Sequence, residues 1–99
     1  MKISIEVKET RMTITLEGRL DTLTAPELEE ELKKYSLLQI EEIVVDAEKL
    51  DYISSAGLRT LLQAYKGMKR GGVLRVINTN QITKEVFKVV GFDSLFSIE

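Results

Sequence analysis

The chain contains no cysteine and no histidine among its 99 residues. Without cysteine it can form neither disulfides nor thiolate metal sites, and without histidine it lacks the commonest metal ligand and general base. Serine–histidine and cysteine–histidine catalysis are therefore excluded within this chain. A glycine-rich phosphate loop and a metal-ligand spacing are also missing. We expect no enzyme activity, no metal site and no cofactor.

Strong net charge and long apolar runs are missing as well. The formal charge of −2 argues against a nucleic-acid partner, because proteins that bind phosphate backbones usually present a basic surface. The cluster of Lys66, Lys69 and Arg70 lies at the end of an expected helix, where cations complement the helix dipole. No apolar run has the length of a signal peptide or a membrane span, so the cytoplasm is the expected location and no membrane partner is expected.

The size and composition suit one compact domain. A chain of 99 residues with 43% hydrophobic content buries about two-thirds of its unfolded surface, and it has no room for a second core. We therefore treat residues 1–99 as a single domain.

The first part of the chain has the two-residue alternation of β-strands. Apolar and polar residues alternate over residues 3–7 and again over 12–16, with a short polar stretch between them. This pattern predicts two half-buried strands in an antiparallel hairpin. Gly18 then ends the second strand or bends it.

A helix is predicted next. Residues 24–27, Thr-Ala-Pro-Glu, have the spacing of a capping box, with the proline in the first turn. Leu28, Leu32 and Tyr35 recur at helical spacing, and charged residues fill the other face. That charged run indicates a solvated helix face, with a docking surface as the alternative. The expected ion pairs, four residues apart, are Glu29 with Lys33 and Glu30 with Lys34.

The second half alternates strands and helices. Residues 43–45 form a short β-branched run that ends in Asp46 and is typical of a central strand covered on both faces. A helix to about Lys69 follows, and Gly71-Gly72 is expected to end it with a left-handed turn. Residues 73–77 predict another strand. Because each of these strands follows a helix, two parallel crossovers are expected.

A last helix and a short edge strand complete the expected order. Asn80 or Thr79 caps this helix, Gly91 closes it, and residues 95–98 add the edge strand. The apolar positions expected to face the core are Ile82, Val86, Val89 and Val90.

The element order predicts an α/β fold. We expect a mixed four- to five-stranded sheet with three or four helices packed mainly on one face. Because core periodicity accounts for the apolar residues, a monomer is expected.

Residues 51–62 carry most of the functional information. Their spacing changes from strand-like to helical across Ser54 and Ser55, so one of these serines is the helix N-cap. Ala56 and Gly57 have small side chains and leave the entry to the first turn unshielded. An exposed serine there lies in the positive field of a helix N-terminus, where a phosphate would be well placed.

Two motifs, in this order and at this chain length, resemble those of a known family. Residues 51–59 read Asp-Tyr-Ile-Ser-Ser-Ala-Gly-Leu-Arg, and upstream lie Gly-Arg-Leu-Asp at 18–21 and Thr-Ala-Pro-Glu-Leu at 24–28. Together they resemble a STAS domain of the bacterial anti-sigma-factor antagonist type, over essentially the whole chain. The fold of that family agrees in outline with the fold expected above.

The family motif, often Asp-Ser-Ser-Gly or Asp-Ser-Thr-Gly, aligns on Gly57. The alignment puts Ser54 in place of the aspartate, Ser55 on the first hydroxyl position and Ala56 on the second. The resemblance therefore implies phosphorylation at Ser55, with Ser54 as the second choice; Ala56 is a departure from the pattern. It also implies a partner-binding surface at Asp21, Thr22, Asp51, Ser54, Ser55, Ala56, Gly57 and Arg59.

The resemblance further implies a partner-switching regulator of transcription. Its partner would be an anti-sigma factor with serine kinase activity, which binds the unmodified antagonist and releases a sigma factor. Phosphorylation by ATP would reverse this binding, and a metal-dependent serine phosphatase would restore the active form. A carboxylate at Asp21, beside the switch serine, would repel an added phosphate and make the modified state distinct.

Two other functions remain open from the sequence. Asp46 at a strand end could be an aspartate phosphoacceptor, although a paired acidic cluster after the first strand is missing. Asp46 and Asp21 could also form an acidic rim around the serine, but aspartates in loops commonly bond only to nearby backbone.

Alternatively, the chain could be a STAS-type assembly subunit of a transport or signalling complex, in which the serines are only caps.

Overall fold

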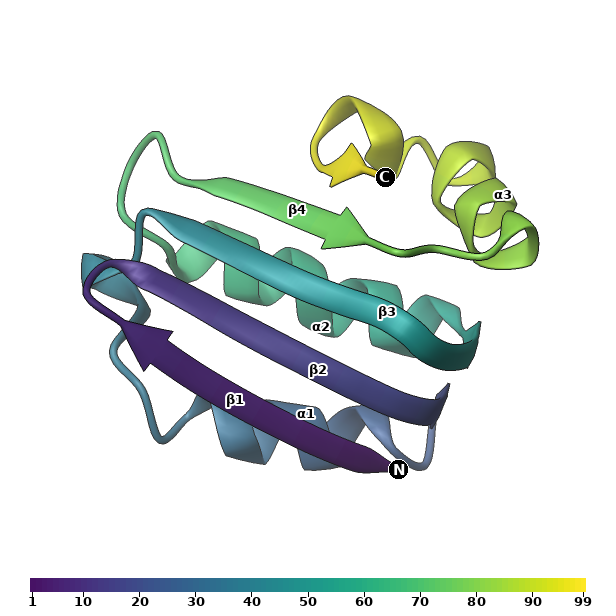
Figure 1. Cartoon of the computed structure of the whole chain (residues 1–99), viewed down its shortest axis with the longest axis horizontal. Helices are drawn as coiled ribbons and strands as arrows, with labels where there is room; N and C mark the ends of the chain where they lie inside the picture. Colours follow the sequence, from purple (N-terminus) through teal and green to yellow (C-terminus); the bar gives the residue numbers. More distant parts are fainter.

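A computed structural model describes residues 1–99, which form a single five-stranded sheet with three α-helices. The sheet order is β1-β2-β3-β4-β5 (Figure 1). None of the helices has the length and apolar character needed to cross a lipid bilayer. In chain order the elements are β1 (Lys2–Lys8), β2 (Arg11–Leu20), α1 (Ala25–Leu32), η1 (Leu37–Gln39), β3 (Glu42–Ile53), α2 (Ser55–Gly67), β4 (Val73–Ile77), α3 (Gln81–Val89), η2 (Phe92–Ser94) and β5 (Ser97–Ile98).

The strand pairing confirms the predicted hairpin and parallel crossovers. β1 and β2 pair antiparallel, with Ile5 opposite Ile14. β2, β3, β4 and β5 are parallel to one another, and α1 and α2 connect β2 to β3 and β3 to β4. The short edge strand predicted near the C-terminus is β5. The expected α/β fold with a mixed sheet is therefore confirmed.

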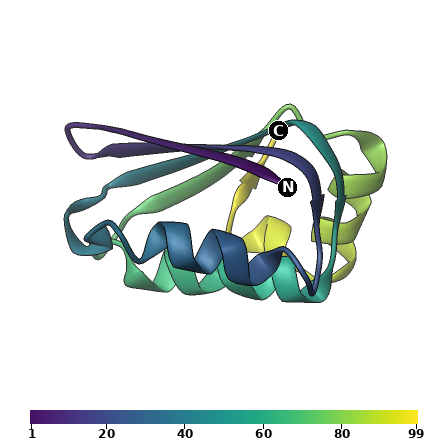
Figure 2. The ribbon, with the colours of Figure 1, turned by 90° about the horizontal axis from the view of Figure 1, so that it is seen from below.

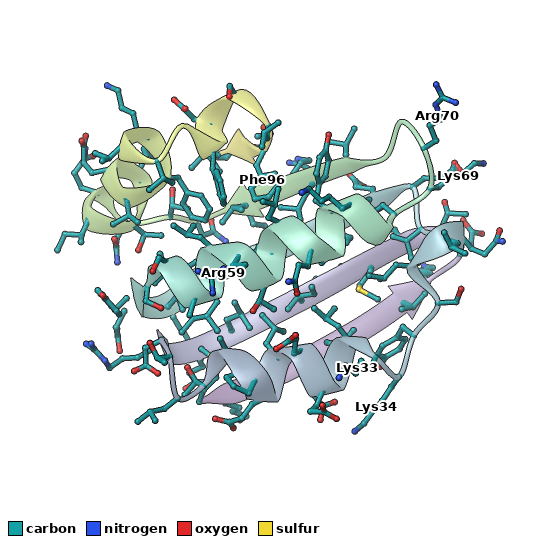
Figure 3. The ribbon with its side chains drawn as sticks, turned by 180° about the vertical axis from the view of Figure 1, so that it is seen from behind. Lys33, Lys34, Arg59, Lys69, Arg70 and Phe96 are labelled. Carbon is teal, nitrogen blue, oxygen red and sulfur yellow. The ribbon has the colours of Figure 1, made fainter.

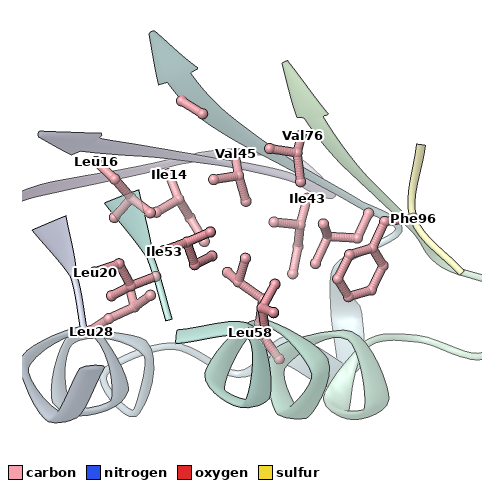
Figure 4. Packing of buried hydrophobic residues seen from close by; sticks show 14 of the residues in the cluster. Ile14, Leu16, Leu20, Leu28, Ile43, Val45, Ile53, Leu58, Val76 and Phe96 are labelled. Carbon is pink, nitrogen blue, oxygen red and sulfur yellow. The ribbon is translucent and has the colours of Figure 1, made fainter. Parts of the chain in front are cut away.

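The hydrophobic core lies between the sheet and the layer formed by α1 and α2, which cover the same face (Figure 2). Ile14 of β2 and Ile43 of β3 are fully buried and point toward the helices, where Leu58 of α2 meets them (Figure 4). At the β4 side the ring of Phe96 packs edge-on against Tyr65, with centroids 5.4 Å apart. The helices thus leave the other face of the sheet open.

β3 is longer than predicted, because it continues beyond Asp46 to Ile53. Its pairing with β2 has register shifts between Thr15 and Glu17 and between Gly18 and Arg19. These irregularities break the two-residue alternation, so the buried residues of this part of β3 follow a spacing of three: Ala47, Leu50 and Ile53. The sequence pattern therefore does not look like a strand there. Gly18 has a positive φ of 107° within β2, so it bends the strand and does not end it.

The predicted core face of α3 is wrong at three of its four positions, and only Val86, which is partly buried, packs against the core. Thr83 and Phe87 are its buried residues, whereas Ile82 is 68% and Val89 80% exposed and Val90 is also exposed. The helix is rotated because the large Phe87 ring enters the core and meets Phe96 edge-on at 6.4 Å between centroids. Core packing therefore does not account for all apolar residues, and the argument for a monomer loses its basis.

Several helix ends also differ from the prediction. α1 ends at Leu32, and its lysines form ion pairs three residues back, Glu30 with Lys33 and Glu31 with Lys34. α2 ends at Gly67, followed by an extended Met68, so Gly71-Gly72 belongs to the turn before β4. At α3 the structure confirms Asn80 as the cap, because its side chain accepts from the Thr83 N–H at 2.7 Å.

A chain of ion pairs crosses the open face of the sheet. Glu42 of β3 meets Arg11 of β2 at 3.0 Å and Arg75 of β4 at 3.4 Å. Arg75 also binds both carboxylate oxygens of Glu99, at 2.9 and 3.0 Å. The Arg75 hydrogen bonds lower the pKa of Glu99 to about 2. Val44, beside Arg75 in the pairing register, is only 3% exposed on this otherwise open face.

Candidate functional site

The two serines lie where β3 ends and α2 begins, and they have different roles. Ser54 is the N-cap: its backbone is extended and its hydroxyl oxygen accepts from the Gly57 N–H at 3.4 Å. The Ser54 N–H donates to the Leu20 carbonyl at 2.9 Å, which ties the start of α2 to the end of β2. Ser55 is the first helical residue and is exposed. The cap function falls on Ser54, and the Ser55 hydroxyl is accessible.

Gly57 allows the first turn of α2 to pack tightly on the sheet. A Cβ atom at this buried position would lie 2.7 Å from Leu20 Cγ and 3.1 Å from Ile53 Cγ1. The first of these distances is shorter than a normal carbon–carbon contact. A glycine is therefore required here for close approach, and it fixes the position of the two serines relative to the ends of β2 and β3.

Asp21 organises the turn that precedes α1. Its Oδ1 accepts from the N–H groups of Leu23 at 3.0 Å and Thr24 at 3.1 Å. The Thr24 hydroxyl oxygen also lies 3.1 Å from it, but the single hydroxyl hydrogen has its shorter acceptor in the Arg19 carbonyl, at 2.6 Å. The Thr24 backbone hydrogen bond is the main reason why the pKa of Asp21 lies below its usual value, with smaller contributions from Leu23, the Thr24 hydroxyl and Arg19. Asp21 follows Leu20 directly, and the Leu20 carbonyl accepts from the Ser54 N–H, so the backbone of this turn leaves the sheet beside the start of α2.

The capping box predicted for α1 is absent because the Thr24 side chain forms its hydrogen bonds within the turn that precedes the helix. The Thr24 hydroxyl accepts from the Asp21 N–H at 2.8 Å and donates to the Arg19 carbonyl at 2.6 Å, and it makes no bond to the first turn of the helix. The predicted helix start at Thr24 and the proline in the first turn are confirmed, and only the side-chain cap is missing, because the Thr24 hydroxyl bonds within the preceding loop.

Arg19 and Tyr52 are site residues that the sequence analysis missed. The Arg19 guanidinium lies 4.4 Å from the centre of the Tyr52 ring, and its Nε is 3.7 Å from Asp21 Oδ2. The stack joins β2 and β3 directly before Ser54. Both residues belong to the two motifs, one to each, but because they are exposed nothing in the sequence pairs them without the strand register.

Thr22, Ala56 and Arg59 line one shallow groove of about 320 Å³ between α1 and α2. Figure 3 shows Arg59 on α2. Arg59 takes part in none of the ion pairs of the chain. The groove therefore presents Arg59, a cation without an ion pair one helical turn from Ser55, together with small side chains and the carboxylate of Glu29.

The two remaining acids lie in different places. Asp51 is exposed on β3, three residues before Ser54. Asp46 was predicted to end its strand, but it lies within β3. Its Oδ1 accepts from the Glu48 N–H and from Asn78 Nδ2, both at 3.1 Å. Seven residues of extended chain, roughly 20 Å, separate Asp46 from Ile53.

The surroundings of Asp46 do not favour the phosphoacceptor interpretation. Its carboxylate is half-buried and engaged by Glu48 and Asn78. No group of three or more acidic side chains that could hold a metal ion exists around it or elsewhere in the chain. Aspartate phosphorylation of this kind uses oxygen ligands to bind Mg²⁺. The acidic rim of Asp21 and Asp46 is likewise not formed beside Ser55.

Comparison with known proteins identifies the family. The model of the STAS domain matches residues 2–99. The chain is 32% identical over 99 residues to BtrV of Bordetella bronchiseptica, a protein provisionally named an anti-sigma factor antagonist. The match covers 99% of this chain and 85% of the relative.

Solved structures share the fold. An anti-sigma factor antagonist from Mycobacterium paratuberculosis superposes with a TM-score of 0.85 at 21% identity, covering 98% of this chain and 83% of that one. The Bacillus cell fate determinant SpoIIAA in its phosphorylated form gives a TM-score of 0.74 at 19% identity, covering 99% of this chain and 91% of that one. At these identities the likeness concerns the fold alone.

Proposed function

The chain belongs to the STAS domain family, and on this basis we propose that it is an anti-sigma-factor antagonist whose partner binding is switched off by phosphorylation of Ser55. The relative at 32% identity carries the name of such an antagonist, and a protein of the same fold is known in a phosphorylated form. In this proposal the chain is the substrate of a kinase and has no enzyme activity of its own.

The observation that carries the proposal is the exposed Ser55 at the first position of α2. Ser54 already supplies the cap to the Gly57 N–H, so the Ser55 hydroxyl has no structural task in the helix start. A helix of 13 residues presents a positive field and free N–H groups at this end, which favour an added phosphate. Ser55 is thus free both to meet a partner and to be modified.

The partner surface in this proposal surrounds Ser55. The Asp21 turn contributes Thr22 to the groove that Ala56 and Arg59 also line. Gly57 and Asp51 complete the set, the first by holding α2 close to the sheet and the second as an exposed acid on β3. Small residues around the hydroxyl allow a partner to approach the helix start closely.

Phosphorylation changes this surface by charge and by size. A phosphate adds about −1.5 to −2 charges and three acceptor oxygens at Ser55. A partner surface fitted to a hydroxyl offers the phosphate no cation of its own, so burying the added charge at the interface is strongly unfavourable. Binding is therefore lost, and the anti-sigma factor returns to its sigma factor. A kinase activity of the anti-sigma factor and a serine phosphatase would drive the two directions of the cycle.

A displacement assay tests the antagonist function. Each anti-sigma factor of the source organism is purified in complex with its sigma factor, and the unmodified chain is added at increasing concentration. We expect at least one complex to release its sigma factor when the chain reaches about equal molar amount, as measured by size-exclusion chromatography. If every complex stays intact while the chain remains folded, the antagonist function is wrong and an assembly role gains support.

A further inference from the structure

The outer edge of β1 is an unprotected strand at the border of the sheet. β1 pairs only with β2, over seven consecutive residue pairs without a register shift (Figure 1). It contains no proline, and its backbone groups on the outer side have no strand to pair with. Edge strands with an uninterrupted register are templates for pairing with another strand. The opposite border of the sheet, in contrast, ends in the two-residue β5.

The side chains of β1 alternate in chemistry as well as in direction. Ile3, Ile5 and Val7 lie opposite the buried residues of β2 and share the helix-covered face. None of the three is fully buried, and Val7 is 40% exposed. On the open face the strand carries Lys2, Ser4, Glu6 and Lys8. An added strand would therefore cover apolar side chains on one face and meet polar and charged side chains of both signs on the other.

We propose that β1 is a homodimer interface, in which β1 of a second copy pairs antiparallel with β1 so that the two Ser4 residues lie opposite each other. In this register Lys2 faces Glu6 of the second copy, and Ile3 faces its Ile5. Each contact occurs twice because the arrangement is two-fold symmetric. Opposite charges and apolar pairs directly across a strand pair are both stabilising.

The neighbouring registers are less complementary. Pairing centred on Ile5 places Lys2 against Lys8 of the second copy, and pairing centred on Glu6 places the two Glu6 carboxylates against each other. Like charges directly opposite across strands are destabilising. A shift by a single residue would instead place Ile3 and Ile5 against polar residues. Charge and apolar pattern thus select the register centred on Ser4.

The dimer would extend the sheet without covering the serine site. Because the two copies of β1 run antiparallel, the ends of β3 that carry Ser54 and Ser55 point in opposite directions in the two copies. α1 and α2 of both copies lie on the same face of the continuous sheet. A single strand pair buries less area than a standard interface, so we expect a weak, concentration-dependent dimer with a Kd of the order of 10 µM to 1 mM.

Cysteine cross-linking tests the register, because the chain has no cysteine of its own. In Ser4→Cys the two thiols lie directly across the seam, at Cβ separations of about 4.5–5.5 Å that permit a disulfide. In the matched variant Lys8→Cys, at an exposed residue that has no partner in this register, the thiols lie eight residues out of register, roughly 26 Å apart. Under mild oxidation Ser4→Cys is expected to form dimers at least about tenfold faster than Lys8→Cys. Equal rates would overturn the proposal.

Charge reversal tests the same interface independently. Lys2→Glu and Glu6→Lys alone each create two repulsive pairs and should raise the dimer Kd about tenfold in sedimentation equilibrium. The double variant restores opposite charges across the seam, so it should dimerise as the unmodified chain does. All three should keep the same circular dichroism spectrum. A chain that stays monomeric at every concentration would overturn the proposal. So would a dimer that these charge changes leave intact but that dissociates in Ile82→Ser, since Ile82 is an exposed apolar residue of α3 and lies outside β1.

Discussion

Ser55→Glu is expected to weaken binding of the cognate anti-sigma factor by roughly 100-fold, since an unpaired charge buried at an interface commonly raises Kd by one to several powers of ten. The glutamate brings a negative charge to the exposed first residue of α2, where the unmodified hydroxyl is small. Isothermal titration calorimetry with the purified anti-sigma factor measures the change.

The fold should tolerate this substitution. A carboxylate in the first turn interacts favourably with the helix dipole, by about 0.3–1 kcal/mol, so the melting temperature should stay equal or rise slightly. Ser55→Ala serves as the control, because it removes the hydroxyl without adding charge and should keep binding within about tenfold. Equal affinities for the glutamate variant and the unmodified chain would contradict a switch at Ser55.

Gly57→Ala is expected to destabilise the protein by about 1–3 kcal/mol, the range for adding a methyl group to a well-packed core. The new Cβ would lie 2.7 Å from Leu20 Cγ, a branch point of the side chain that cannot move away by a simple rotation of its end. Alanine is favoured over glycine in helices by up to about 1 kcal/mol, so the overlap must outweigh this gain. For a domain of this size, thermal unfolding should shift downward by roughly 5–15 °C.

Gly67→Ala is the matched control within the same helix. There the nearest side-chain atom to a new Cβ is Leu37 Cδ1 at 3.4 Å, an ordinary contact. The helix propensity of alanine should then leave stability unchanged or raise it by some tenths of a kcal/mol. If both variants unfold at the same temperature, the close approach of Gly57 to the sheet does not constrain α2.

The strands and their pairing were largely predictable, because the alternation in residues 3–7 and 12–16 and the β-branched run at 43–45 depend on local sequence only. The second half of β3 was not. Its bulged register replaces alternation by a spacing of three, and that spacing arises only when β2 lies beside it. A pattern of this kind cannot be recognised from one strand alone.

The rotation of α3 shows a second limit. Ile82 and Val89 define an apolar stripe that periodicity alone selects as the core face, while Phe87 lies on another. The buried face is the one that carries Phe87, whose ring packs against Phe96, nine residues further along the chain. A single sequence does not reveal which of the two apolar faces of α3 packs against the core.

The candidate site was predictable in its residues but not in its contacts. The change of periodicity at the serines located the helix start, and the structure assigns the cap to Ser54 among the two possibilities. The Thr24–Glu27 spacing predicted a capping box, but the Thr24 hydroxyl bonds to the Asp21 N–H and the Arg19 carbonyl of the preceding loop, which the spacing does not reveal. The Arg19–Tyr52 stack needed the register between β2 and β3 and could not be predicted.

Phosphate mapping tests the central claim most directly. The protein is incubated with extract of its source cells and ATP, and its intact mass and peptides are compared with those of Ser55→Ala and Ser54→Ala. The account predicts one added phosphate that maps to Ser55, persists in Ser54→Ala and vanishes in Ser55→Ala. A phosphate on Ser54 alone would contradict the assignment of the site. An unmodified protein, in an extract that phosphorylates other substrates, would contradict the switch itself.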